Sequence, residues 1–183
     1  MAKEKVFIQI DGNNFYHRLK EMELKNLLSF DYKKLADFIL NRNDKDLVLA
    51  KYYIGTIREE AGNATSKTLM IGQQKLLGNL QKQGWQVGFG NMLKTDVYHE
   101  KGVDVLMAVD MLVAAYENLC DKIILISSDT DLLPAIDKTK ALGKIVEYIG
   151  FFHKASHAMI DRCSSSFLLR KSDLEGCLES PKN

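Results

Sequence analysis

The sequence has little of several features that mark special classes of protein. Only two of its 183 residues are proline and no serine- or glutamine-rich tract occurs, which excludes collagen-like, mucin-like and linker-rich chains. The three cysteines are widely spaced and form no C-x-x-C pair, so neither a disulfide framework nor a zinc site is expected. They are typical of reduced thiols, and we expect a cytoplasmic protein.

The sequence also lacks a charge excess and a long hydrophobic run. Its 25 lysines and arginines nearly balance 24 aspartates and glutamates, so a nucleic-acid partner would have to be recognised by a local patch. The first apolar segment, residues 6–10, ends at Asp11 and is too short for a signal peptide or a membrane span. We therefore expect no membrane association.

Short apolar segments alternate along the chain with stretches of helical periodicity. The expected strands are residues 6–10, 46–54, 85–89, 122–126 and 144–149, with a sixth at 167–169. Apolar strands separated by helices indicate a parallel sheet covered on both faces. We predict an open, doubly wound α/β fold with a mostly parallel sheet of five to six strands. It should form a single domain over residues 1–172, followed by a short polar tail at 173–183.

Several acidic residues are expected at one edge of this sheet, either directly after a strand or at the start of a helix. In a doubly wound sheet, ligands bind beyond the carboxyl ends of the strands, near the point where strand order reverses. Asp11 directly follows the first strand, and residues 127–131 (SSDTD) follow the fourth. Asp104 opens the helix between the third and fourth strands, so its carboxylate should reach the same edge. We expect the carboxylates of Asp11, Asp104, Asp129 and Asp131 to converge.

Each of these residues taken singly also has a structural explanation. Asp11 and Asn14 could be loop and cap residues, Asp104 a first-turn residue favoured by the helix dipole, and Asp131 an N-cap. The combination favours a shared site, because carboxylates within about 4–6 Å of one another repel unless a cation neutralises them. Oxygen ligands suit Mg²⁺ or Mn²⁺, which commonly polarises a phosphoryl oxygen and activates water. The pattern therefore indicates phosphoester hydrolysis.

Polar groups near the acidic cluster could orient waters, carboxylates or a phosphate. They are the amides of Asn13 and Asn14 and the hydroxyls of Ser127, Ser128 and Thr130. A possible substrate contact lies in residues 61–100, which carry four lysines against two acidic residues. Within and just after this segment, Lys94, His99 and Lys101 lead directly into Asp104 and are candidates for binding a single-stranded backbone. A solvated helix face followed by an ordinary loop would explain the same residues.

Three motifs occur in order along the chain. Residues 11–14 (DGNN) follow the first strand, residues 101–104 (KGVD) open a helix that also contains Asp110, and residues 127–132 (SSDTDL) follow the fourth strand. Together they resemble the motifs of the NYN domain, in the LabA-like branch of the PIN-like nucleases. The resemblance covers about residues 5–170. It implies a PIN-like sheet with the first and fourth strands adjacent, and a metal-dependent ribonuclease activity.

For the site, the resemblance implies that Asp11, Asp104 and Asp129 bind the metal and that Asp131 completes the catalytic acidic cluster. Asn14 would support Asp11, and the hydroxyl of the serine at 127 would lie near the phosphate. The serine at 128 departs from the family, because many relatives have glycine there. We expect an endoribonuclease that acts on single-stranded RNA with Mg²⁺ or Mn²⁺, and the resemblance also raises the expectation of a homodimer.

Two alternatives remain open at this point. An inactive or regulatory RNA-binding module of the same fold is the non-enzymatic alternative, because fold does not settle activity. A haloacid-dehalogenase-like phosphatase is a weaker enzymatic alternative, since residues 129–131 imitate its nucleophile loop. That loop needs threonine or valine where this chain has Leu133.

Overall fold

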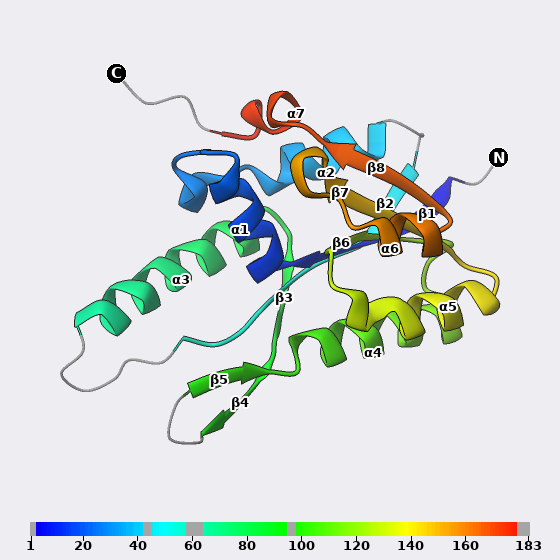
Figure 1. Cartoon of the computed structure of the whole chain (residues 1–183), viewed down its shortest axis with the longest axis horizontal. Helices are drawn as coiled ribbons and strands as arrows, with labels where there is room; N and C mark the ends of the chain where they lie inside the picture. Colours follow the sequence, from blue (N-terminus) through cyan, green and yellow to red (C-terminus); the bar gives the residue numbers. More distant parts are fainter. Residues whose placement is uncertain (1–2, 42–44, 58–63, 95–97, 179–183) are drawn as a thin grey trace.

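The computed structural model describes residues 3–41, 45–57, 64–94 and 98–178 of the chain. Its centre is a six-stranded sheet in which every neighbouring pair of strands is parallel. The strands are β1 (Glu4–Asp11), β2 (Lys45–Ile54), β3 (Gln86–Phe89), β6 (Lys122–Ile126), β7 (Ile145–Phe151) and β8 (Ser165–Leu169). Their order across the sheet is β3-β2-β1-β6-β7-β8, so the order reverses between β1 and β6 (Figure 1). The predicted doubly wound α/β fold is confirmed.

Helices cover both faces of the sheet (Figure 1). One face is covered by α1 (Gly12–Glu21), α2 (Tyr32–Asn41), α3 (Ala64–Lys82) and α7 (Lys171–Glu175). The other is covered by α4 (Val103–Tyr116), α5 (Leu133–Ala141) and α6 (His157–Arg162). Three short 3-10 helices join them: η1 (Leu27–Ser29), η2 (Thr130–Leu132) and η3 (Phe152–Lys154). No helix in the described part of the chain combines the length and apolar character that a membrane span requires.

The central strands are buried because apolar side chains leave both of their faces. In β6, all five residues are buried. Ile124 and Ile126 pack into the core under α1 and α2, whereas Ile123 and Leu125 pack into the core under α4 and α5. This is the period-2 alternation of a strand between two helical layers, and it explains why the sequence there is apolar without interruption.

A short antiparallel hairpin precedes α4, and the sequence analysis did not predict it. β4 (Asn91–Lys94) pairs with β5 (Tyr98–Lys101), and Lys94 lies opposite Tyr98. The hairpin leaves the edge of the main sheet and returns to the amino end of α4 (Figure 1). The three predicted substrate-binding residues, Lys94, His99 and Lys101, belong to its strands, but their side chains lie outside the described residues.

The packed chain extends beyond residue 173, where the sequence predicts the start of a polar tail. Leu174 in α7 and Cys177 after it are buried in the core shared with α1 and α2. The backbone N–H of Asp31 donates to the carbonyl of Cys177 at 2.7 Å. The expected boundary at residue 172 therefore lies inside a packed helix. The segment after it packs against the core because two of its side chains, Leu174 and Cys177, are apolar. Residues 179–183 lie outside the described part.

Gly12 begins α1 directly after β1, in a place too tight for a side chain. A Cβ at Gly12 would lie 2.6 Å from the backbone oxygen of Tyr53 and closer still to the ring of Tyr52. Both tyrosines are fully buried, so neither can move aside. We expect Gly12→Ala to lower the free energy of unfolding by about 1–3 kcal/mol, the usual cost of overpacking.

The matched control is Gly78→Ala in α3, where a Cβ meets nothing within 4 Å. Because alanine favours a helix over glycine by about 1 kcal/mol, this variant should be as stable as the wild type or slightly more stable. Urea unfolding measures both effects. Equal stability of the two variants would show that the space around Gly12 is not limiting.

Candidate active site

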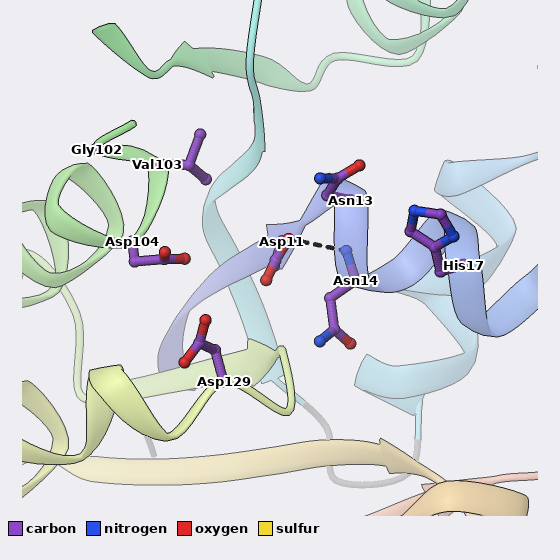
Figure 2. Close-up of a pocket in the computed structure, with 8 residues that line it drawn as sticks. All are labelled: Asp11, Asn13, Asn14, His17, Gly102, Val103, Asp104 and Asp129. Carbon is purple, nitrogen blue, oxygen red and sulfur yellow. Dashed lines mark hydrogen bonds between the residues drawn. The ribbon is translucent and has the colours of Figure 1, made fainter. Parts of the chain in front are cut away.

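A pocket of about 310 Å³ lies where the strand order reverses, beyond the carboxyl ends of β1 and β6. Figure 2 shows the side chains that line it. They are Asp11, Asn13, Asn14, His17, Gly102, Val103, Asp104 and Asp129. The structure thus brings together the three carboxylates that the sequence analysis named as metal ligands.

Asp11 is the last residue of β1 and caps the amino end of α1. Its Oδ1 accepts a hydrogen bond from the backbone N–H of Asn14 (3.0 Å), and its Oδ2 accepts one from the Ser127 hydroxyl (2.9 Å). Burial raises the pKa of Asp11, and these two hydrogen bonds oppose the rise. Asn14 supports Asp11 through its backbone, and the hydroxyl of Ser127 is committed to a carboxylate in this arrangement.

Asp129 follows β6 and caps η2. Its Oδ1 accepts from the backbone N–H of Asp131 (2.9 Å), while its own N–H donates to the Ser127 hydroxyl (3.1 Å). Ser127 therefore joins the two acidic residues that come from neighbouring strands. The carboxylate of Asp129 is directed toward the space between Asp11 and Asp104 (Figure 2).

Besides Ser127, three residues predicted for this edge are not among those that line the pocket. Thr130 and Asp131 are exposed on η2. Asp131 contributes to the site through its backbone N–H, which donates a hydrogen bond to the Asp129 carboxylate. The Ser128 hydroxyl lies 3.0 Å from the Tyr148 hydroxyl, which directs it toward β7.

Asp104 lies in the first turn of α4 and reaches the pocket from the opposite wall. Gly102 before it has a φ of 90° and supplies no side-chain cap, so the amino end of α4 is open toward the pocket. The pKa of Asp104 is raised to about 6. Burial is the largest cause, and repulsion from the carboxylates of Asp129, Asp11 and Asp131 is the second. The pKa shift therefore reports that these acidic groups lie close enough to repel.

The donor set of the pocket fits an oxygen-preferring divalent cation. Carboxylates and asparagine amides supply oxygen atoms, and among the side chains that the structure describes no lysine or arginine lines the pocket. Among the residues that the structure describes, no three His, Cys, Asp or Glu side chains are gathered tightly enough to hold one ion as they stand. Mg²⁺ keeps several waters and needs only one or two direct carboxylates, so three carboxylates around a pocket suit a hydrated ion.

One polar residue of the pocket, His17, was not among the candidates that the sequence offered. His17 lies on α1 four positions after Asn13 and three after Asn14, so its side chain is a neighbour of each on the surface of the helix. The signal was available, because this spacing follows directly from the position of Asp11 at the helix cap. A histidine and two amides on this wall would face any substrate that fills the pocket.

Comparisons with known proteins place the chain among others of similar sequence and fold. The family model described as the NYN domain matches residues 5–170. A solved structure of a protein of unknown function from Vibrio parahaemolyticus superposes with a TM-score of 0.69 at 23% identity, covering 94% of this chain and 96% of that one. This likeness shows a shared fold.

A second solved structure is T5 5′-exonuclease with bound zinc. It superposes with a TM-score of 0.43 at 15% identity, covering 85% of this chain and 60% of that one. The likeness is too distant to indicate function. The search of curated proteins found no match.

The raised pKa of Asp104 predicts how the stability of the metal-free protein depends on pH. A carboxyl whose pKa rises from 3.8 in the unfolded chain to about 6 in the fold binds its proton more tightly when folded. Its contribution to the free energy of unfolding is complete below pH 3.8 and is lost as the pH rises through about 6. Asp104→Asn has no such titration.

We therefore expect the wild type to lose stability relative to Asp104→Asn as the pH is raised through this range. Urea unfolding of both proteins in EDTA, at fixed ionic strength, measures the difference at each pH. The titrating groups remote from Asp104 are common to both proteins, so their effect cancels. The neighbouring carboxylates repel one another less in the variant, which acts in the same direction as the loss of the Asp104 titration. Parallel pH curves would contradict the raised pKa.

Proposed function

Because the chain belongs to the NYN domain family, we propose that it is a divalent-metal-dependent nuclease that hydrolyses phosphodiester bonds in single-stranded RNA. The observation that carries the proposal is the convergence of the Asp11, Asp104 and Asp129 carboxylates on one pocket. Family membership supports nuclease chemistry in general. The preference for RNA, the internal cleavage and the LabA-like branch rest on the three motifs in the sequence.

The residues of the pocket have distinct tasks in this proposal. Asp11, Asp104 and Asp129 hold Mg²⁺ or Mn²⁺, which when bound polarises a phosphoryl oxygen and lowers the pKa of a water. Hydrogen bonds from Asn14 and Ser127 keep the Asp11 carboxylate in one orientation. The side chains of Asn13, Asn14 and His17 lie on the substrate side of the pocket. In the reaction, water attacks phosphorus, the bond to the leaving ribose oxygen breaks, and that oxygen takes up a proton.

The substrate path proposed from the sequence, along residues 61–101, ends in the β4–β5 hairpin. Lys94 and Lys101 belong to its two strands, and β5 ends next to Gly102, which lines the pocket. A strand of RNA that follows the hairpin would therefore reach the carboxylates.

The homodimer and the cytoplasmic location stay predictions from the sequence. For the dimer, the surface to examine is the apolar face that α4 exposes at Val105, Val109 and Val113.

Asp129→Asn tests the role of the acidic cluster without disturbing the loop. The asparagine side-chain oxygen can still cap η2, so only the charge is lost. We expect cleavage of labelled single-stranded RNA in Mn²⁺ to fall at least about a hundredfold. In EDTA the melting temperature should stay equal or rise, because repulsion between like charges is relieved.

Metal binding should also become visible in the melting temperature. Free Mn²⁺ at a hundred times its dissociation constant stabilises the wild type by about 2.7 kcal/mol, and Asp129→Asn should show a smaller gain. Asp137→Asn is the control, because this exposed residue of α5 pairs with Arg162 of α6, does not line the pocket and should leave cleavage unchanged. A variant destabilised in EDTA with an undiminished Mn²⁺ effect would make Asp129 purely structural.

The same assay separates the alternatives. RNA binding by the wild type without cleavage under any divalent ion would favour the inactive RNA-binding module. Hydrolysis of p-nitrophenyl phosphate without cleavage of RNA would favour a phosphatase. A panel of labelled single-stranded and duplex RNA and DNA decides the substrate class, and the ends of the products distinguish internal from terminal cleavage.

The salt dependence of RNA binding tests the hairpin path. For single strands, the slope of log affinity against log salt falls by about 0.7 for each phosphate contact that is lost. We expect Lys94→Ala combined with Lys101→Ala to lower both the affinity and this slope. The control pair is Lys34→Ala with Lys171→Ala on α2 and α7, which lie on the other side of the molecule from the hairpin (Figure 1). Identical slopes for all three proteins would show that RNA takes another path.

A further inference from the structure

A polar network joins β1, β2 and α4 beneath the pocket, and the proposed reaction does not use it. The Gln9 side-chain amide donates to the Tyr53 hydroxyl (2.8 Å) and to the backbone carbonyl of Met107 (3.2 Å). The Tyr53 hydroxyl donates to Asp110 Oδ2 (2.8 Å), and Lys51 Nζ donates to the same oxygen (2.5 Å). Four side chains from three elements are thereby linked.

Each part of this network lies next to a residue of the pocket. Gln9 precedes Asp11 by two positions in β1, so both side chains leave the same face of the strand. On β2, Tyr53 is the register partner of Asp11. On α4, Met107 lies about one turn after Asp104, and Asp110 follows less than one turn later.

The buried side chains of α4 are apolar. Val103, Met107, Met111 and Ala114 belong to the same core cluster as Phe7 and Leu125. Apolar packing is not directional, and methionine side chains adapt readily to a shifted neighbour. The amino end of α4 has no side-chain cap, since the residue there is Gly102.

The polar network provides directional contacts between α4 and the sheet, which the apolar contacts do not. If α4 slid or turned, the Asp110 side chain would lose its hydrogen-bond partners in a partly buried place, which is costly for a polar group. Gln9 is fully buried, and its Oε1 has no hydrogen-bond partner within the described residues. An apolar residue at this position would avoid that cost, so the network is not explained by stability alone.

We propose that Gln9, Tyr53, Asp110 and Lys51 are positioning residues for the acidic pocket. They hold α4 against β1 and β2 at the offset that keeps Asp104 facing the ion site formed with Asp11 and Asp129. None of the four lines the pocket, so they act through the position of α4. The inference rests on the proposed metal-dependent function.

Tyr53→Phe is the first variant, because it removes one hydroxyl and leaves a ring that fits the same core. Mn²⁺ affinity is measured directly, by electron paramagnetic resonance of free Mn²⁺ without RNA. We expect the dissociation constant to rise about 10- to 100-fold, as is usual when a group that orients ligands is lost. With RNA and saturating Mn²⁺, kcat should fall while KM stays near its wild-type value.

Two variants at Asp110 separate positioning from charge. Asp110→Asn keeps an oxygen that can accept from Tyr53, so its Mn²⁺ affinity should stay within about threefold of the wild type. Asp110→Leu removes the acceptor and should weaken binding as much as Tyr53→Phe or more. Equal losses in the two variants would mean that the charge of Asp110, and not its hydrogen bonds, matters, and would overturn the proposal.

The matched control is Glu147→Gln, which disturbs the buried contact between Lys122 and Glu147 on β6 and β7. It should lower the melting temperature and leave Mn²⁺ affinity unchanged. If it weakens Mn²⁺ binding as much as Tyr53→Phe does, or if Tyr53→Phe binds Mn²⁺ like the wild type, the positioning role is refuted. A wild type that binds no Mn²⁺ would instead refute the proposed function, and the inference with it.

Discussion

Repulsion between carboxylates held at one edge of the sheet is the constraint on which the rest of this structure depends. Burial first, and repulsion from neighbouring carboxylates second, raise the pKa of Asp104 to about 6 and also raise that of Asp11, so the fold holds these groups where ionisation is disfavoured. Flexible loops would let such groups move apart. The chain instead places Asp11 at the end of β1, Asp129 at the cap of η2 and Asp104 in the first turn of α4. Each carboxylate is thus carried by an element with its own packed support.

The strand order creates the space that these carboxylates surround. β1 and β6 are neighbours in register from Val6 and Lys122 to Ile10 and Ile126, so Asp11 and Ser127 leave the sheet side by side. The chain after β1 turns into α1 on one face, and the chain after β6 turns through η2 into α5 on the other. Because the two connections diverge, a pocket opens between them, as is usual where strand order reverses.

Most of the sheet could be predicted because its strands are continuous apolar runs. The strand at residues 122–126 was predicted with the bounds that β6 has, and placing Asp11 and residues 127–131 at the sheet edge followed from those bounds. The β4–β5 hairpin escaped because its residues are largely polar and carry no hydrophobic period. His17 escaped because a polar residue that lines a pocket looks like one that faces solvent. The bond from Ser127 to Asp11 joins residues 116 positions apart and needs the register of the two strands.

Apolar packing and buried hydrogen bonds have different tasks in this molecule. The two cores contribute most of the stability, but nondirectional contacts tolerate small displacements of a helix. The carboxylate of Asp104 must meet those of two other elements, and a displacement of α4 by a fraction of a turn would separate them. A well-packed apolar replacement for a buried ion pair is often as stable as the pair itself. The contacts among Gln9, Tyr53 and Asp110 are therefore better explained by the geometry of the pocket than by the stability of the fold.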